Sequence, residues 1–129
     1  MFTYTIMPDY GMAAYAWIKK PGDIANNVGG NIADATGWLG EHPISKELEA
    51  DLAVWAIEFE REVNEETEKT FNWLDFHSRG IVLSRRLKAE LGPDVRVIYE
   101  KPYEDHDCAI EERREILPDG SIKLLDSRS

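Results

Sequence analysis

The chain has 129 residues, enough for one domain around a single core, and its 43% hydrophobic residues exclude a disordered acidic tail. With 25 acidic against 15 basic residues, its net charge of −10 opposes binding to nucleic acid or to an anionic membrane surface and favours a basic partner. The single cysteine, Cys108, excludes an internal disulfide, and no apolar run approaches the roughly twenty residues of a membrane span.

The first twenty residues predict a β-hairpin. Apolar residues alternate with Thr over 2–6, and the turn-forming residues of 8–11 interrupt the pattern before a second apolar stretch at 15–18. The segment 21–43 that follows is rich in Gly and Asn, so we expect mostly a loop there, in which 32–39 could add a helical turn.

A first helix is predicted over about 45–68. Ser45 is a suitable N-cap, and the helix dipole favours Glu47 in the first turn. Apolar residues then recur every three or four positions and form one continuous face, made of Ile44, Leu48, Leu52, Trp55, Phe59 and Val63.

A second helix is predicted over about 72–91. Its apolar face contains Trp73, Phe76, Gly80, Leu83, Leu87 and Leu91. Gly92 and Pro93 end the helix, because glycine tolerates a left-handed cap and proline cannot continue a helix. Glycine inside a helix costs roughly 1 kcal/mol relative to alanine. We therefore expect another backbone to approach Gly80 closely and the two helices to cross near it.

The last third of the chain predicts strands. Residues 95–100 are β-branched and bounded by prolines, and the turn at 118–120 separates 109–117 from 121–125 as a terminal hairpin. The predicted order of elements, in which strands precede and follow two helices, indicates one α+β domain over residues 1–129. In it, both helices would pack on one face of a small, mainly antiparallel sheet.

Acidic residues gather in the first predicted helix. Residues 41–68 hold ten acids against two basic residues, whereas 79–96 carries a net charge of +3. On a helical wheel of about 100° per residue, five carboxylates lie on one flank, beside the apolar face. We call them the carboxylate stripe: Glu47, Asp51, Glu58, Glu62 and Glu65. Its like charges at four-residue spacing repel one another, so something should compensate them.

Two kinds of explanation for the carboxylate stripe stay open. Arg79 and Arg86 of the second helix could face it, or it could be a solvated face; alternatively, it is a docking surface for a basic protein. An apolar strip on the same helix, formed by Ala50, Ala53, Val54 and Ile57, would be covered by the Gly-rich loop or by a partner. The acidic connector after residue 100 adds further candidate contacts for a partner, namely Glu104, Asp105 and Asp107.

Residues for metal or acid–base chemistry are few. His106 and Cys108 stand two apart, so on an extended segment both would point to one side, but two ligands do not make a metal site. We therefore expect no metal, no cofactor and no catalytic centre. The alternative is a small enzyme or metal-dependent domain that uses His77, His106 and Cys108.

Core residues between Leu48 and Tyr99 carry a resemblance to a known class of protein: Trp55, Phe59, Phe76, Gly80, Leu83, Leu87, Leu91, Gly92 and Val97. This stretch resembles the small immunity proteins of bacterial polymorphic-toxin and contact-dependent growth-inhibition systems. Such proteins protect a cell by binding a toxic domain, often a nuclease, which must be basic where it grips phosphates.

The resemblance implies a non-enzymatic inhibitor that occludes the basic active surface or an essential exosite of its cognate toxin domain. We expect it to be monomeric when free, and to be cytoplasmic because its N-terminus lacks the pattern of a signal peptide. A structural or adaptor subunit is the second alternative.

Overall fold

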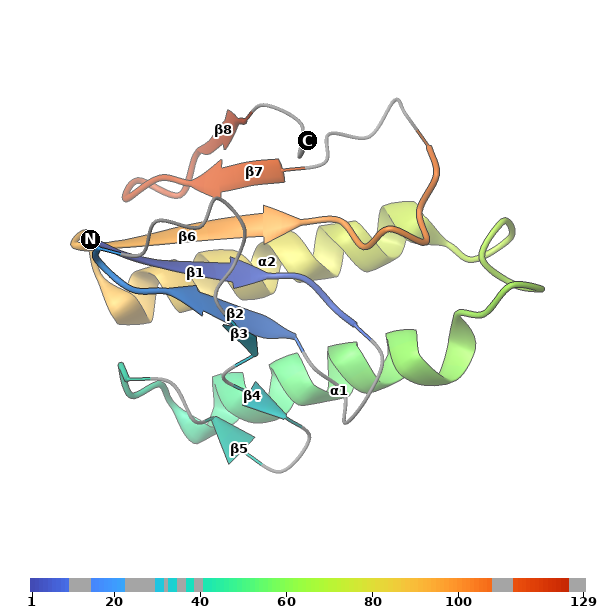
Figure 1. Ribbon diagram of the computed structural model, residues 1–129, viewed down its shortest axis with the longest axis horizontal. Coiled ribbons are helices and arrows are strands. Elements are labelled where there is room, and N and C mark those ends of the chain that lie inside the picture. Colours follow the sequence, from blue (N-terminus) through green and yellow to red (C-terminus); the bar gives the residue numbers. More distant parts are fainter. Residues whose placement is uncertain are drawn as a thin grey trace.

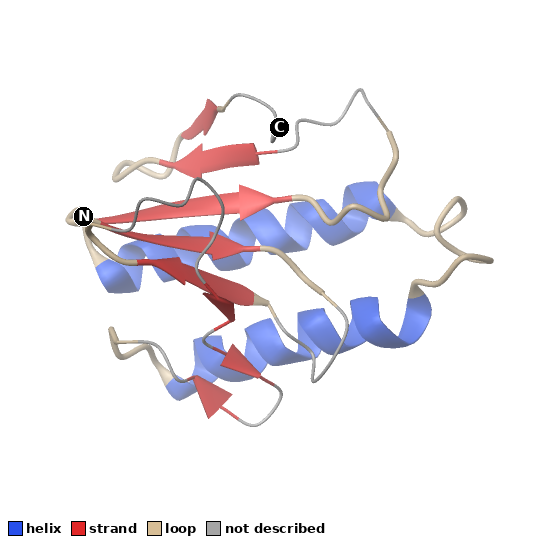
Figure 2. Ribbon diagram, viewed as in Figure 1, coloured by secondary structure: helices blue, strands red, loops and turns tan. Residues whose placement is uncertain are grey.

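Strands precede and follow two consecutive helices, so the protein is α+β (Figures 1 and 2). The computed structural model describes residues 1–9, 15–22, 30–31, 33–34, 37–38, 41–107 and 113–125. Its elements in chain order are β1 (Phe2–Ile6), β2 (Ala16–Lys19), β3 (Gly30–Asn31), β4 (Ala33–Asp34), β5 (Gly37–Trp38), α1 (Lys46–Glu62), α2 (Trp73–Leu91), β6 (Val95–Glu100), β7 (Arg113–Ile116) and β8 (Ile122–Leu124).

Within the described residues, six strands form one sheet in the order β3-β2-β1-β6-β7-β8. The predicted hairpins at both ends of the chain are confirmed, since β1 pairs antiparallel with β2 and β7 with β8. The central pair differs from its neighbours, because β1 runs parallel to β6 with Tyr4 opposite Val97. The sheet is therefore mixed, although most of its pairs are antiparallel.

The segment 21–43 is only partly described. Its described parts include β3, which extends the main sheet, and the pair β4–β5, in which Ala33 lies opposite Trp38. These short strands replace the helical turn that the sequence allowed at 32–39. The first part of the predicted strand 109–117 lies outside the described residues, and so does Cys108.

Helix α1 begins where the sequence predicts and ends earlier. Ser45 is its N-cap, as expected, and its hydroxyl accepts a hydrogen bond from the N–H of Leu48 at 3.2 Å. The helix ends at Glu62 instead of near residue 68. The hydroxyl of Thr67 donates to the carbonyl of Glu62 at 2.6 Å, and the Asn64 side chain accepts from the N–H of Thr67 at 3.1 Å. These local bonds stabilise a turn in competition with further helix.

Gly80 lies at the point where α2 packs on its neighbours, as its place on the apolar face predicts. A Cβ atom there would lie 2.7 Å from a ring atom of Trp55 on α1 and 2.9 Å from one of Tyr99 on β6. The expectation of a second backbone at Gly80 is therefore wrong, because two aromatic rings occupy the space. The Trp55 ring also stacks on Phe76 at 4.6 Å between centroids.

The core joins these helices to the sheet. It includes Tyr4, Ile6, Val97 and Ile116 from the strands, and Leu48, Leu52, Phe59, Phe76 and Leu87 from the helices, all of them fully buried. No helix in the described parts of the chain is long and apolar enough to cross a bilayer.

Candidate functional site

Two members of the carboxylate stripe are neutralised by α2. Glu58 binds the guanidinium of Arg79 through both carboxylate oxygens, with 2.8 Å from Nη2 to Oε1, and Asp51 accepts from Nη1 of Arg86 at 2.7 Å. Arg79 also donates to Asp75 at 2.9 Å, and its hydrogen bonds to Glu58 are the main cause that raises its pKa. One of the open explanations, compensation by α2, therefore holds for these two carboxylates.

The other three members of the carboxylate stripe are exposed. Glu47 and Glu62 lie near opposite ends of α1, and Glu65 lies beyond the helix, in the turn that ends it. Among the residues that the structure describes, none of these three forms an ion pair. They leave uncompensated negative charge at this surface.

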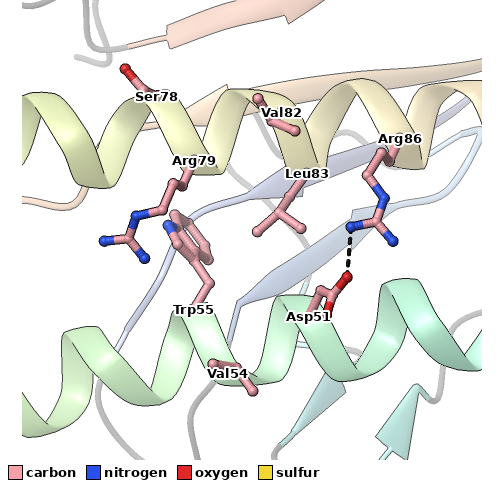
Figure 3. Close-up of a pocket in the computed structure, with 8 residues that line it drawn as sticks. All are labelled: Asp51, Val54, Trp55, Ser78, Arg79, Val82, Leu83 and Arg86. Atoms are coloured by element: carbon pink, nitrogen blue, oxygen red, sulfur yellow. Dashed lines mark hydrogen bonds and ion pairs between the residues drawn. The ribbon is translucent and has the colours of Figure 1, made fainter.

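A groove of about 390 Å³ separates the exposed sides of α1 and α2 (Figure 3). Trp55 and Leu83 are buried and point between the helices, so they form its floor. The groove is lined by Asp51, Val54, Trp55, Ser78, Arg79, Val82, Leu83 and Arg86. Val54 is 67% exposed and Val82 is 53% exposed, which is unusual for two large aliphatic residues that line the same groove.

The groove accounts for part of the predicted apolar strip on α1. Ala53 and Ile57 are partly buried and pack against the core. Ala50 and Val54 are exposed. Within this strip, Val54 is the large apolar side chain that the described structure leaves in solvent.

Asp105 of the acidic connector does not face solvent, which corrects its place among the partner contacts. Its side chain is only 1% exposed and accepts a hydrogen bond from Nε2 of His77 at 2.7 Å. The other ring nitrogen of His77, Nδ1, lies 2.7 Å from the hydroxyl of Tyr99. Because a carboxylate can only accept, Nε2 carries the proton and Nδ1 accepts from Tyr99.

Burial is the largest influence on the pKa values of His77 and Tyr99. It lowers the pKa of His77 against the opposing effect of the hydrogen bond to Asp105, and it raises the pKa of the Tyr99 hydroxyl. The neutral histidine and the protonated tyrosine match the hydrogen bonds observed. The available signal for the burial of His77 was its place four residues after Trp73, beside Phe76 on the apolar face of α2.

The rest of the connector is folded around Asp105. The N–H of Asp107 donates to Asp105 Oδ1 at 3.0 Å, and the ammonium of Lys101 donates to the carbonyl of Asp107 at 2.7 Å. The side chain of Asp107 is exposed and that of Glu104 is half-buried. These two can still meet a partner, whereas Asp105 serves the fold.

The proposed metal or catalytic trio is not assembled in the described structure. His77 is buried, and His106 is 67% exposed with Nε2 3.2 Å from Glu68. Cys108 lies outside the described residues. In the described ranges, no group of three or more His, Cys, Asp or Glu side chains is placed to hold a metal ion.

A family model described as Serratia CdiI immunity protein-like matches residues 3–102. The chain belongs to this family. The immunity-protein resemblance read from residues 48–99 is thereby confirmed, and membership points to the neutralisation of a toxin. A search of curated proteins found no match.

The family match contains most of the candidate surface. It covers all of α1, α2 and the groove between them, and it ends before Glu104. Helical spacing identifies the carboxylate stripe but not Val82, because spacing alone does not show whether a valine of α2 is buried or exposed. The spacing of Arg79 and Arg86, seven residues apart like Asp51 and Glu58, was the available signal.

Proposed function

We propose that this member of the immunity family neutralises a cognate, basic toxin domain, such as a nuclease, by covering its active surface or an essential exosite with α1 and the adjoining turn. The observation that carries the proposal is the set of three exposed carboxylates that α2 does not neutralise, at Glu47, Glu62 and Glu65. Family membership supplies the class of partner, a toxin protein.

Electrostatic attraction favours the surface of α1 and the adjoining turn as the contact for a basic toxin domain. A nuclease concentrates cations where it grips phosphates, and carboxylates outside internal ion pairs can attract the same cations. Such exposed charges steer association and fix orientation, while burial of apolar groups supplies most of the lasting affinity. The inhibitor then acts sterically, without chemistry of its own. Glu104 and Asp107 would widen the contact at one edge.

We expect an immunity protein to be encoded directly downstream of its toxin, so the test uses the toxic domain of the upstream gene product. We expect the two purified proteins to form a 1:1 complex, and co-expression of the chain to restore growth of cells that express the toxin domain. Glu62→Lys should slow association about tenfold. Lysine at the end of α1 suits the helix dipole, so the fold should persist.

Asp94→Lys is the matched control, because it makes the same change of charge at an exposed turn before β6. It should associate at nearly the wild-type rate. Absence of any complex between the wild-type chain and the toxin domain would contradict the proposed function, and equal slowing by both variants would show that only net charge matters.

A further inference from the structure

The groove between α1 and α2 has the same layout on both helices. On α1, Val54 stands three residues after Asp51 and four before Glu58. On α2, Val82 stands three residues after Arg79 and four before Arg86. Because Asp51 pairs with Arg86 and Glu58 with Arg79, the helices run antiparallel and an ion pair closes each end of the groove.

The floor of the groove is held in place by several contacts. Nε1 of Trp55 donates to the carbonyl of Phe76 at 3.1 Å, and the indole fills the space left by the missing side chain of Gly80. The guanidinium of Arg79 lies 5.8 Å from the centre of the Phe76 ring. An apolar site with a floor fixed in this way needs little rearrangement to bind, which favours affinity.

We infer that this groove receives an apolar anchor side chain from a basic segment of the toxin domain, an inference that rests on the proposed function. Its volume of about 390 Å³ falls in the size range of binding pockets and suits one large side chain. Contact with such an anchor would cover the exposed sides of Val54 and Val82. Buried apolar or aromatic anchors of this kind dominate the binding energy of protein interfaces.

Charge decides between this occupant and a second copy of the chain. Two copies that met through the groove would bring their uncompensated carboxylates together, with a net charge of −10 on each. A basic segment instead gains attraction from Glu47 and Glu62, which lie on the same helix as Val54. Asp51 binds Arg86 through Oδ2, and in the described part of the chain Oδ1 is left to accept from a cation of the partner.

The test separates apolar insertion from charge. Val82→Glu and Val54→Glu each add a negative charge, which would strengthen or preserve a purely electrostatic complex with a basic partner. If the groove takes an apolar anchor, each variant should instead weaken binding of the upstream-encoded toxin domain by about thirtyfold or more, mainly through faster dissociation. Glutamate favours helices more than valine does, so both variants should fold.

Leu124→Glu is the matched control, since Leu124 is 57% exposed on β8, outside the groove, and receives the same charge. It should bind as the wild type does. Far-UV circular dichroism and urea midpoints confirm that all variants are folded. If the wild type binds and both groove variants bind equally well, the inference is overturned while the proposed function stands. If light scattering shows a dimer of the free chain that Val82→Glu dissociates, a second copy occupies the groove, which also overturns it.

Discussion

Gly80 in α2 shows how one missing side chain positions the candidate surface. The rings of Trp55 and Tyr99 fill the volume that a Cβ atom would take, so α1, α2 and β6 meet at this residue. Trp55 also forms part of the floor of the groove. Any residue that pushed this ring outward would therefore change both the core and the surface above it.

Replacing Gly80 with alanine should destabilise the fold. Alanine favours a helix by about 1 kcal/mol over glycine, but here the added methyl must displace two buried rings. We expect the free energy of unfolding to fall by about 1–3 kcal/mol, as in other overpacked cores. Urea unfolding measures this change in the free energy of unfolding. Ser78→Ala, on the exposed side of the same helix, is the control. A midpoint that stays unchanged or rises would contradict the packing described for Gly80.

His77 links α2 to the connector through groups that face it from several elements. Tyr99 approaches from β6 and Asp105 from the connector, and the nearby cations Lys101 and Arg114 add positive charge. Burial lowers the pKa of His77 in the folded protein, with the cations acting in the same direction and Asp105 opposing them. The folded protein therefore holds His77 neutral at pH values where the unfolded chain protonates it.

This difference in proton binding predicts a loss of stability in mild acid. Below about pH 6.5, the ordinary pKa of histidine, the unfolded state takes up a proton that the folded state refuses. The free energy of unfolding should therefore decrease as the pH falls, by up to about 1.4 kcal/mol per pH unit, until the lowered pKa of folded His77 is reached. Urea unfolding of the wild type and of His77→Gln between pH 7.5 and 5 measures this contribution as a difference in slope.

Ser78→Ala provides the control for this measurement, because it changes an exposed residue of the same helix and removes no titratable group. It should keep the slope of the wild type. Equal slopes for the wild type and His77→Gln would show that the buried histidine does not couple folding to pH.

At the scale of elements, the sequence predicted the helices and the terminal hairpins, because local residue spacing determines them. Apolar residues spaced three and four positions apart located both helices. Ser45 marked the start of α1 and Gly92 the end of α2, and turn residues marked the terminal hairpins. The end of α1 was misjudged. The apolar face stops at Val63, but the prediction extended the helix to about residue 68, where Asn64 and Thr67 form bonds that favour a turn. Periodicity reports which residues face the core, and it does not weigh side-chain bonds to the backbone.

Long-range pairings account for what the sequence did not predict. Nothing in Phe2–Ile6 or Val95–Glu100 specifies that these strands pair in parallel, since both are apolar strands with many possible neighbours. Likewise, the sequence placed Asp105 in an acidic connector, and only the fold brings it to His77. The carboxylate stripe could be found from the helical wheel, but its division into neutralised and uncompensated members depends on how α2 lies against α1.

Across the whole molecule, charge and apolar contact occupy one surface and should control different steps of binding. The uncompensated carboxylates act over a distance, so they change the rate of association. The groove acts only in contact, so it changes the rate of dissociation. This division lets one set of kinetic measurements distinguish the two contributions.

We expect association of the chain with its upstream-encoded toxin domain to slow as salt rises from low to physiological ionic strength, where exposed charges are screened beyond about 8 Å. The triple variant Glu47→Lys, Glu62→Lys and Glu65→Lys should associate more than tenfold more slowly at low salt, because attraction becomes repulsion. Its association should no longer slow with added salt. Stopped-flow or surface-plasmon measurements at several salt concentrations give both rate constants.

Val82→Glu is the internal comparison for this experiment, since it alters the groove and leaves the three carboxylates in place. Its association should still slow with added salt, because the charge that it adds is also negative, while its dissociation is faster. If the triple variant instead retains the wild-type association rate and salt response, the three carboxylates are a solvated face of α1 and its turn. The next residues to test would then be the two acids of the connector that reach solvent, the half-buried Glu104 and the exposed Asp107, because Asp105 is buried against His77.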